Sequence, residues 1–444
     1  MRRIDRLEVW HTGPDGQQRI MGHLARNTRG VIGVTFDPDF LKTGWRLSPF
    51  LLPQGAGPFV PRFEAGQTNL FHGLFGLFAD SLPDAFGMAV ARRSVTEAGC
   101  EAGALELLSY IGEGGRGCLS YKPNLPEGEG EVEGLQAMFI EARSVAEGLE
   151  IDFANPLAHA MGTAGGTRPK VHCERFSDGT FRVRRSPAKA MEGIACIVKF
   201  DCTGGFAGRI DHETKVEAAY MAMARDCGLR VSEFELVARE EREHLVLQRF
   251  DRTAKGALHF HSFWGLAHAT ANSRINDYEF LHRTVMRLTS DAAEVAEFFG
   301  RMAFNVLACN QDDHAKQHGF LFDGMNWKLS PAFDLTFSPN PTLGHAMPLS
   351  GNANPSKKEL LAFADKMDVR NGKEVLERIQ DTLSSAPNYL KANRVPSSVI
   401  ARVVDGISSM APSILCCRLL ASQRPAKTQW NLRGCVFKLC CPSW

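Results

Sequence analysis

The sequence predicts an α+β protein of two lobes, and three observations lead to this prediction. Short apolar runs separated by Gly, Pro and Asp fill residues 5–60, and more of them recur up to residue 250, as expected of antiparallel strands. Apolar residues at helical spacing dominate the chain after residue 277 and predict helices over about residues 277–288, 291–308, 357–369, 373–384 and 397–411. The chain has 444 residues, 44% hydrophobic and 23% charged, an ordinary globular composition. A strand-rich part followed by a helix-rich part is typical of an enzyme with its cleft between two lobes.

Charge and targeting signals indicate a cytoplasmic protein. Its 51 basic and 50 acidic residues leave a net charge of +1, so no overall field marks it as a binder of nucleic acids or membranes. No apolar run is long enough to cross a bilayer, and residues 1–16 are charged where a signal peptide has an apolar core. Seven of the twelve cysteines lie singly between Cys100 and Cys309, as reduced cysteines do, and the other five crowd into the tail.

The first element along the chain is a small antiparallel sheet within residues 5–60. Helical spacing begins at Phe71, in FHGLFGLFADSLPDAFGMAVARR, and is broken at the corner Leu82-Pro83-Asp84. Phenylalanine-rich stripes of this kind are far more often core than cofactor site. The charged stretch PEGEGEVEG, residues 126–134, is typical of an exposed connector, and we expect a helix over residues 133–147 after it.

A glycine pair precedes a strand that contains a lysine. Gly165 and Gly166, in GTAGGTRPK, allow backbone conformations in which amides turn inward around an anionic group. Lys199 lies within the apolar strand IACIVKF, where a lysine needs a partner. Kinases hold the α and β phosphates with a lysine on a strand behind a glycine loop. A plain surface turn, and a lysine at a strand end or edge, remain the alternative interpretations.

The next helix offers the expected partner for Lys199. Residues 213–227 have helical spacing and end at Gly228, and they place Glu213 and Glu217 one turn apart on the same face. Either glutamate could pair with Lys199, and the spacing favours Glu217 slightly over Glu213. The strand over residues 245–250 follows, and we expect the backbone from Gln248 to Phe250 to face a nucleotide base at a hinge between the lobes.

The stretch NQDDHAKQHGFLFDGMNWKLSPAFDLT, residues 310–336, carries the proposed chemistry. The spacing predicts a buried helix that ends near Cys309, then a hairpin around Asp323-Gly324, so that Asp334 returns toward Asp312. Phosphoryl transfer needs one carboxylate that receives the proton of the nucleophile and another that holds magnesium against the phosphates.

Two other interpretations of this stretch stay open. Asp312, Asp313 and His314 could simply cap a helix or turn, as aspartate often does. They could also be ligands of zinc or manganese in a hydrolase, but the sequence nearby offers no further ligands at regular spacing.

Five motifs in this order resemble those of the HipA family of serine/threonine kinase toxins, and the similarity spans about residues 4–411. They are GGTRPK, IVKF, QRFDR, NQDDHAK and LSPAFDLT, beginning at residues 165, 197, 248, 310 and 329. FADSLPDAFG at residues 78–87 is similar to the N-terminal subdomain of the family. The resemblance implies a two-lobed HipA/protein-kinase-like α+β fold with a strand-rich N-terminal lobe and an all-helical C-terminal lobe.

The resemblance also implies roles for residues, with ATP and Mg²⁺ as cofactors. Asp312 is expected to be the catalytic base, Lys316 to stabilise the transferring phosphoryl group, and Asp334 to bind magnesium. Thr163 falls where family members carry a serine that is autophosphorylated, and a phosphate there would add about −1.5 to −2 charges near the ATP phosphates. The residues expected to bind the cofactor are Gly165, Gly166, Lys170, Lys199, Glu217, Gln248 and Phe250.

Two features depart from the family pattern. Gln317 stands where the family has an asparagine that helps to hold magnesium; it offers the same amide oxygen on an arm longer by one methylene. We therefore expect catalysis that is retained but weaker. Residues 415–444 have five basic residues, no acid, five cysteines and no helical period, and their cysteine pairs lack the spacing of a zinc knuckle. We expect a disordered or aberrant extension.

The sequence thus predicts four regions: an N-terminal subdomain (1–125), a nucleotide-binding part (126–255), a helical catalytic lobe (256–412) and a Cys-rich tail (413–444). By the resemblance, the protein is the kinase toxin of a toxin–antitoxin pair. Its partners are a DNA-binding antitoxin of the HipB type, through which DNA is contacted indirectly, and a protein substrate such as an aminoacyl-tRNA synthetase. No membrane contact is expected. The alternative is a catalytically silent ATP-binding corepressor of the antitoxin, which Gln317 favours.

Overall fold

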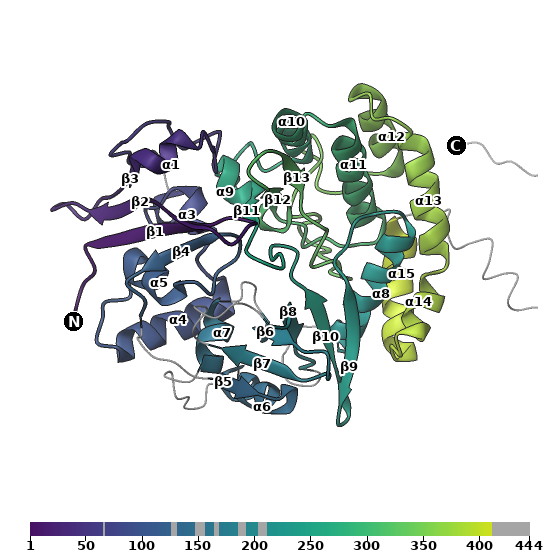
Figure 1. The fold of residues 1–444 in the computed structure, drawn as a ribbon. Coiled ribbons are helices and arrows are strands. Elements are labelled where there is room, and N and C mark those ends of the chain that lie inside the picture. Colours follow the sequence, from purple (N-terminus) through teal and green to yellow (C-terminus); the bar gives the residue numbers. More distant parts are fainter. Residues whose placement is uncertain are drawn as a thin grey trace, which may run out of the picture.

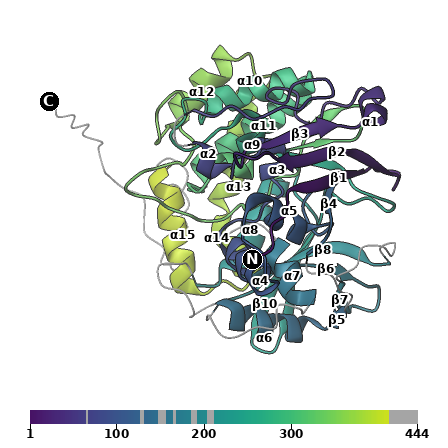
Figure 2. The ribbon, with the colours of Figure 1, turned by 90° about the vertical axis from the view of Figure 1, so that its left-hand side faces the viewer.

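The computed structural model describes residues 1–64, 67–125, 131–146, 156–163, 168–184, 192–202 and 211–410. The glycine pair Gly165-Gly166 and the tail from residue 411 onward lie outside these ranges. Figures 1 and 2 show a first sheet at one end of the molecule, a second sheet below it, and the last helices at the opposite end. Within the described ranges, no helix is long and apolar enough to cross a membrane.

The N-terminal sheet is antiparallel and has the strand order β3-β2-β1-β4. Strand β4 lies beyond residue 100 in the sequence but pairs with β1. The helices between β3 and β4 therefore form a long connection that starts and ends in this sheet. The strands are β1 (Arg6–Thr12), β2 (Gln18–Arg26), β3 (Ile32–Phe36) and β4 (Leu119–Lys122). The helices are α1 (Pro38–Lys42), α2 (Gln67–Leu70), α3 (Gly76–Ala79), α4 (Ala85–Glu97) and α5 (Ala104–Ile111).

The second sheet has the order β5-β7-β6-β8-β10-β9, and its neighbouring strands pair antiparallel. Side chains alternate across it. Val171, Val198 and Val246 pack on one face in a core with α6 and α7, while Leu245 and Leu247 pack on the other face with α8. The strands are β5 (Glu131–Glu133), β6 (Lys170–Arg175), β7 (Phe181–Arg184), β8 (Ile194–Lys199), β9 (Phe234–Arg239) and β10 (Arg242–Gln248). The helices are α6 (Leu135–Ala146), α7 (Pro156–Thr163) and α8 (Glu213–Asp226).

The C-terminal region is mostly helical but contains a three-stranded sheet, β11-β12-β13, so the expectation of an all-helical lobe is wrong. The hairpin at Asp323-Gly324 forms, with Gly324 at φ +100°, and it needs a partner for its free edge. The short strand HFHS supplies that partner. The strands are β11 (His259–Ser262), β12 (Gly319–Phe322) and β13 (Trp327–Leu329), with the short 3₁₀ turn η1 (Ala315–Gln317) before β12.

One large core joins the helices of this region to α8. Phe298, Phe299 and Met302 of α11 are fully buried in it, and so are Val216 and Tyr220 of α8. The helices are α9 (Phe263–Ala267), α10 (Tyr278–Thr289), α11 (Ala292–Leu307), α12 (Lys357–Lys366), α13 (Gly372–Ser384), α14 (Ala386–Ala392) and α15 (Ser397–Met410). The sequence predicted α10, α11, α12, α13 and α15 within a few residues, but α9 and α14 were missed because each spans only one or two turns. Because α8 packs on the second sheet as well, it ties the strand-rich and helical regions together.

Candidate active site

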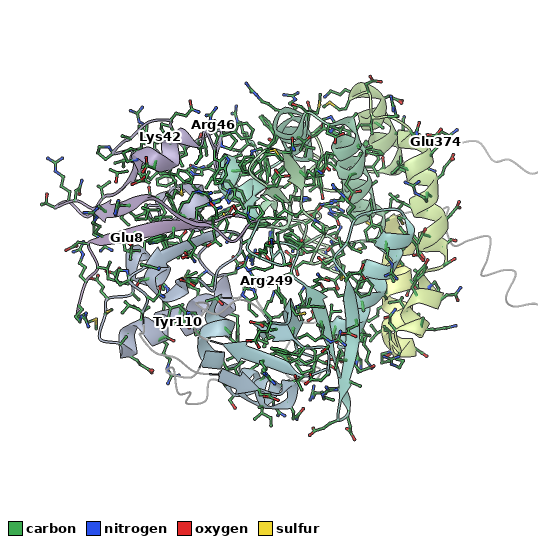
Figure 3. All side chains as sticks on the ribbon, viewed as in Figure 1. Glu8, Lys42, Arg46, Tyr110, Arg249 and Glu374 are labelled. Carbon is green, nitrogen blue, oxygen red and sulfur yellow. The ribbon has the colours of Figure 1, made fainter. Side chains whose placement is uncertain are left out.

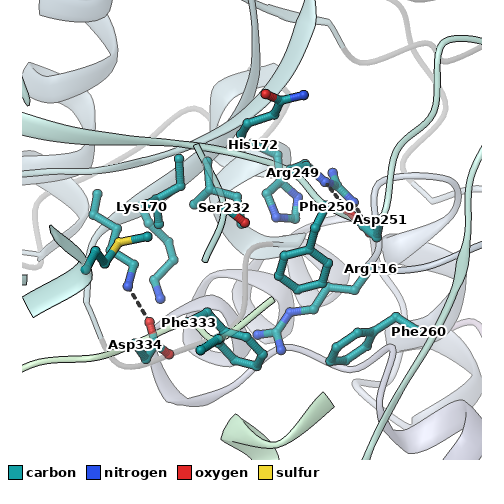
Figure 4. A pocket seen from close by; sticks show the side chains of 16 residues that line it. Arg116, Lys170, His172, Ser232, Arg249, Phe250, Asp251, Phe260, Phe333 and Asp334 are labelled. Carbon is teal, nitrogen blue, oxygen red and sulfur yellow. Dashed lines mark hydrogen bonds and ion pairs between the residues drawn. The ribbon is translucent and has the colours of Figure 1, made fainter. Parts of the chain in front are cut away.

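A pocket lies against the α8 face of the second sheet (Figure 4). The register places Lys170 opposite Lys199, and His172 opposite Ile197, so the alternation of the strands sends all four side chains toward it. Seven of the sixteen lining residues are apolar, and they come from both the second sheet with α8 and the C-terminal region. They are Ile197, Met221, Leu247, Phe250, Phe260, Ala332 and Phe333.

Lys199 has two carboxylate partners. Its ammonium group lies 2.5 Å from Glu217 Oε1, and it also forms an ion pair with Asp334. Glu213, the alternative that the spacing left open, pairs with Arg168 instead. Burial alone would lower the pKa of Lys199, but the charges of Asp334 and Glu217 raise the pKa above its ordinary value, so this lysine stays charged.

Lys170 is buried, and within the described ranges it forms no ion pair. Its side chain is one of the lining groups, the residue is only 7% exposed, and no carboxylate among the described residues lies within 4 Å of its ammonium group. Burial lowers the pKa of Lys170 to about 8, although the charge of Asp334 acts in the opposite direction. A buried cation without a counterion is costly, so this position is suited to an anionic ligand.

Asp334 is held in a left-handed backbone conformation, with φ +53°. Aspartate tolerates this region better than most residues, but such conformations are uncommon outside turns and functional sites. Burial would raise the pKa of Asp334, yet Lys199, Lys170 and Arg116 hold it well below its usual range. Asp334 is therefore a carboxylate that stays ionised beside two lysines.

Asp312 lies near Asp334 but does not line the pocket. A backbone bridge joins Asn310 to Ser338, and the N–H of Asp312 donates to Ser338 Oγ at 3.1 Å, so the segments before and after the hairpin lie side by side. Asp312 is exposed. Partial burial and the negative charge of Asp334 raise its pKa, while His314 opposes the shift. The carboxylates of Asp312 and Asp334 are thus close enough to interact electrostatically, in agreement with the expectation that the hairpin returns Asp334 toward Asp312.

Asp313 is buried and stabilises the loop around it through hydrogen bonds. From the sequence, capping of a helix or turn was one interpretation of this residue. Its fully buried carboxylate accepts a hydrogen bond from the hydroxyl of Tyr278 at 2.5 Å and lies 2.8 Å from His345 Nδ1. The backbone N–H of Met347 also donates to it, at 3.4 Å. These bonds fix the loop that presents Asp312.

Lys316 and Gln317 follow on η1. The ammonium group of Lys316 lies 2.5 Å from Asp84 Oδ1 and 4.3 Å from the centre of the Trp264 ring. Gln317 is half-buried, and its backbone N–H donates to the carbonyl of His314 at 2.8 Å. Whether its amide binds magnesium stays a prediction.

The predicted hinge residues reach the pocket. Gln248 and Phe250 both line it, and the ring of Phe250 lies 5.7 Å from that of Phe333. The N–H of Gln248 already donates to the carbonyl of Glu233 at 2.9 Å. Arg249, near the middle of the molecule in Figure 3, is buried and lies 2.8 Å from Asp251 Oδ2. The backbone contact with a base stays a prediction.

Thr163 is the last residue of α7 and is only 3% exposed. Its hydroxyl donates to the carbonyl of Ala160 at 3.1 Å and lies 3.5 Å from His172 Nδ1. The expected autophosphorylation therefore requires the end of α7 to open. The glycines expected next to it, Gly165 and Gly166, lie outside the described residues.

Sequence reasoning missed the contribution of the N-terminal region. Arg116 lines the pocket, and Asp84 contacts Lys316. The glycine-rich run GEGGRG, residues 112–117, was the signal that could have indicated Arg116. Among the described residues there is no group of three or more metal-ligand side chains, so the geometry lends no support to the zinc or manganese hydrolase.

Comparison with known families gives matches to both halves of the chain. A family model described as the HipA N-terminal domain matches residues 15–122, and one described as the HipA-like C-terminal domain matches residues 162–390. A curated protein of Sinorhizobium fredii, named "Putative kinase Y4dM", is 28% identical over 220 residues. That alignment covers 45% of this chain and 53% of the relative, so the chain spans about half the length of the curated relative it matches.

Comparison with solved structures shows the fold. The HipA of Shewanella oneidensis, in a toxin–antitoxin complex with HipB and operator DNA, aligns with a TM-score of 0.62 and 17% identity. The alignment covers 91% of this chain and 96% of that one. The kinase CtkA of Helicobacter pylori aligns over 56% of this chain and 90% of its own, with 12% identity and a TM-score of 0.37, too low to indicate a common fold.

Proposed function

This chain belongs to the HipA family, and on that premise we propose that it is an ATP- and Mg²⁺-dependent serine/threonine protein kinase. The observation that carries the proposal is the buried ammonium group of Lys170, which has no ion-pair partner among the described residues and lies beside the Lys199–Asp334 pair. An apolar pocket with cations at one end suits a purine nucleotide, whose base is apolar on its faces and whose phosphates are anionic.

Each residue of the site then has a distinct task. Lys170 and Lys199 bind the phosphates, and Glu217 orients Lys199. Asp334, with Gln317, would hold Mg²⁺, which supplies charge neutralisation of the phosphates when bound. Asp312 orients the hydroxyl of a substrate Ser or Thr and takes its proton. Partial burial and the charge of Asp334 raise the pKa of Asp312, which makes it a better proton acceptor than an ordinary aspartate.

The base of the nucleotide would lie among the apolar groups of the pocket. Phe250 and Phe333 both line it, and the centres of their rings are 5.7 Å apart. Backbone groups between Gln248 and Phe250 would give specificity for adenine. The regulatory phosphorylation at Thr163 belongs to the same proposal, and it requires α7 to unwind at its end.

The biological role that we propose is that of a toxin in a toxin–antitoxin pair. The Shewanella oneidensis structure that shares this fold contains HipB and operator DNA. The corresponding partner here would be a DNA-binding antitoxin, so that contact with DNA is indirect. The phosphorylated substrate would be a protein of translation such as an aminoacyl-tRNA synthetase.

The second candidate is a silent corepressor that binds ATP and the antitoxin without phosphoryl transfer. Gln317 favours it, and so does the ion pair that holds Lys316 on Asp84 rather than on Asp312. Incubation of the purified protein with labelled ATP and a cell lysate separates the candidates. Incorporation of label that is lost in Asp312→Asn, by roughly 10²- to 10⁴-fold, supports the kinase. Nucleotide binding without any transfer supports the corepressor, and absence of ATP binding refutes both.

A further inference from the structure

Arg116 reaches the nucleotide pocket from a different domain. It lies in the run GEGGRG between α5 and β4, within the part of the chain that matches the HipA N-terminal domain. Nevertheless it lines the pocket together with Lys170, Lys199 and Asp334. Figure 4 shows its guanidinium group pointing into the pocket, toward the end where Asp334 lies.

The loop that carries Arg116 is anchored on both sides of it. The carbonyl of Gly115 accepts hydrogen bonds from Arg249 at 2.9 Å and from Arg252 at 2.8 Å. The N–H of Gly117 donates to Asp251 Oδ2 at 2.7 Å. These charge-assisted bonds tie the loop to the end of β10, so the side chain of Arg116 extends from a fixed base.

Within the described residues, the guanidinium group of Arg116 donates no hydrogen bond. Its nearest carboxylate oxygen is Asp84 Oδ2 at 3.6 Å, which is too long for a hydrogen bond. The described part of the chain offers no other ion-pair partner for it within 4 Å. A guanidinium group carries five N–H donors in a planar fork that matches phosphate oxygens. Its charge also lowers the pKa of Asp334 and of Lys170, which indicates that it lies close to the groups expected at the phosphates.

Asp84 bridges Arg116 to Lys316. One oxygen of its carboxylate accepts from Lys316 at 2.5 Å, and the other faces Arg116. The charge of Lys170 acts on it as well, and these cations hold the pKa of Asp84 below its ordinary value although burial opposes them. The carboxylate of Asp84 therefore lies among positively charged side chains, in a position where a phosphate oxygen could bind instead.

We infer that Arg116 is a phosphate-binding residue of the pocket and that Asp84 is a positioning residue, which holds Arg116 and Lys316 in place and competes with the phosphates for them. This inference rests on the proposed function. It adds to that function that the N-terminal domain supplies one of the phosphate-binding residues of the nucleotide site. The ligand that it recognises is the polyphosphate chain rather than the base.

Binding of a series of ligands tests the role of Arg116. Isothermal titration of the full chain with ATP, AMP, adenosine and inorganic tripolyphosphate would be compared for wild type, Arg116→Ala and Arg116→Lys. Arg46→Ala is the matched control, because Arg46 is an exposed arginine of the same domain and bonds only to the carbonyl of Pro49 among the described residues. We expect Arg116→Ala to weaken ATP and tripolyphosphate binding by roughly ten-fold or more, to change adenosine binding by less than about two-fold, and Arg116→Lys to restore part of the loss.

The outcomes separate this inference from the proposed function. Equal ATP affinity of wild type and Arg116→Ala overturns the inference and leaves the kinase intact. Binding of tripolyphosphate that depends on Arg116, without binding of ATP, upholds the phosphate site and refutes the kinase. Circular dichroism melts of each variant show whether a loss of binding comes from unfolding, and Arg116→Lys carries the test if Arg116→Ala is unfolded.

Asp84→Asn tests the positioning role. Removal of its negative charge is expected to tighten tripolyphosphate binding several-fold, because the carboxylate no longer competes for Arg116 and Lys316. It is also expected to lower kcat while KM for ATP falls, a separation that a purely structural defect does not produce. Unchanged affinity together with unchanged kcat would remove Asp84 from the inference.

Discussion

The ammonium group of Lys199 lies 2.5 Å from Glu217 Oε1 and also pairs with Asp334. This one side chain joins β8, α8 and the segment after β13, which are far apart in the sequence. Because Lys199 and Glu217 are buried and Asp334 is partly buried, the geometry of the pocket depends on the presence of both carboxylates.

Glu217→Gln is predicted to lower kcat by roughly 100-fold, because Lys199 then pairs with Asp334 alone and moves away from the phosphates. The measurement is kcat for protein phosphorylation at saturating ATP, well below the melting temperature. Glu294→Gln is the matched control, since Glu294 is a buried glutamate with an arginine partner, Arg230, outside the pocket. A kcat for Glu217→Gln equal to that of the control would contradict the prediction.

ATP binding is predicted to weaken as the pH rises above about 8, where Lys170 of the free protein loses its proton. Because the phosphates favour the charged form, binding near pH 8 is accompanied by proton uptake. Titration calorimetry in buffers of different ionisation enthalpy measures this uptake. Lys170→Met should abolish it, and a proton uptake that persists in this variant would assign it to another group.

Lys170 is expected to affect the stability of the free protein in the opposite direction: as the pH rises, ATP binding weakens but the unfolding free energy increases. Its pKa in the folded state, about 8, lies below the value of 10.5 for an ordinary lysine. Between these values the unfolded chain binds more protons, so the contribution of Lys170 to the unfolding free energy rises with pH. Urea unfolding of wild type and Lys170→Met would be measured at pH 7.5 and pH 9.5, values chosen to lie on either side of the shifted pKa. The unfolding free energy of the variant minus that of the wild type should be smaller at the higher pH.

Tyr278→Phe is predicted to lower the unfolding free energy by about 1–3 kcal/mol, because it removes the hydroxyl that donates to the buried carboxylate of Asp313. Tyr389→Phe removes a hydroxyl of similar geometry, bonded to Asp226 at 2.5 Å, but near the surface. Its cost should stay below about 0.5 kcal/mol. Urea unfolding compares the two, and equal losses would show that Asp313 finds another donor.

Asp80→Ala is predicted to loosen the contact between the N-terminal domain and β11. Asp80 accepts hydrogen bonds from the backbone and the hydroxyl of Ser262, at 2.7 and 2.6 Å, and lies 2.6 Å from His261 Nδ1. Loss of the acceptor leaves these buried groups unpaired, at a cost of about 3 kcal/mol. Hydrogen exchange of the Ser262 amide should speed up. The exposed pair of Asp39 with Lys42 provides the control, because Asp39→Ala should leave that rate unchanged.

Local patterns predicted the long elements and the motif residues of the site. Helices α8, α10 and α11 follow from apolar periodicity that extends over three or four turns, and the β12–β13 hairpin follows from Asp323-Gly324. The pairing of Lys199 with a glutamate of α8 was expected from the rule that a buried lysine needs a partner. Spacing favoured Glu217 only slightly over Glu213, because the two lie one turn apart on the same face, and the structure pairs Lys199 with Glu217.

Short elements and contacts between distant segments could not be predicted in this way. Strand β11 has four residues, and its pairing with β12 depends on a sheet edge that exists only after the hairpin has docked. No local rule connects Arg116 or Asp84 to a pocket built by β6, β8 and the segment after β13. Their position depends on how the N-terminal domain packs against the rest of the chain.

The amino-acid sequence by itself determined which side chains can do the chemistry and which segments form regular structure, because residue type and periodicity are local properties. The tertiary structure alone decided which glutamate faces Lys199, that Lys170 has no counterion among the described residues, and that Arg116 enters the same pocket. The physical reason is that burial and charge pairing arise between segments tens to hundreds of residues apart, and their energies exist only when the chain is packed.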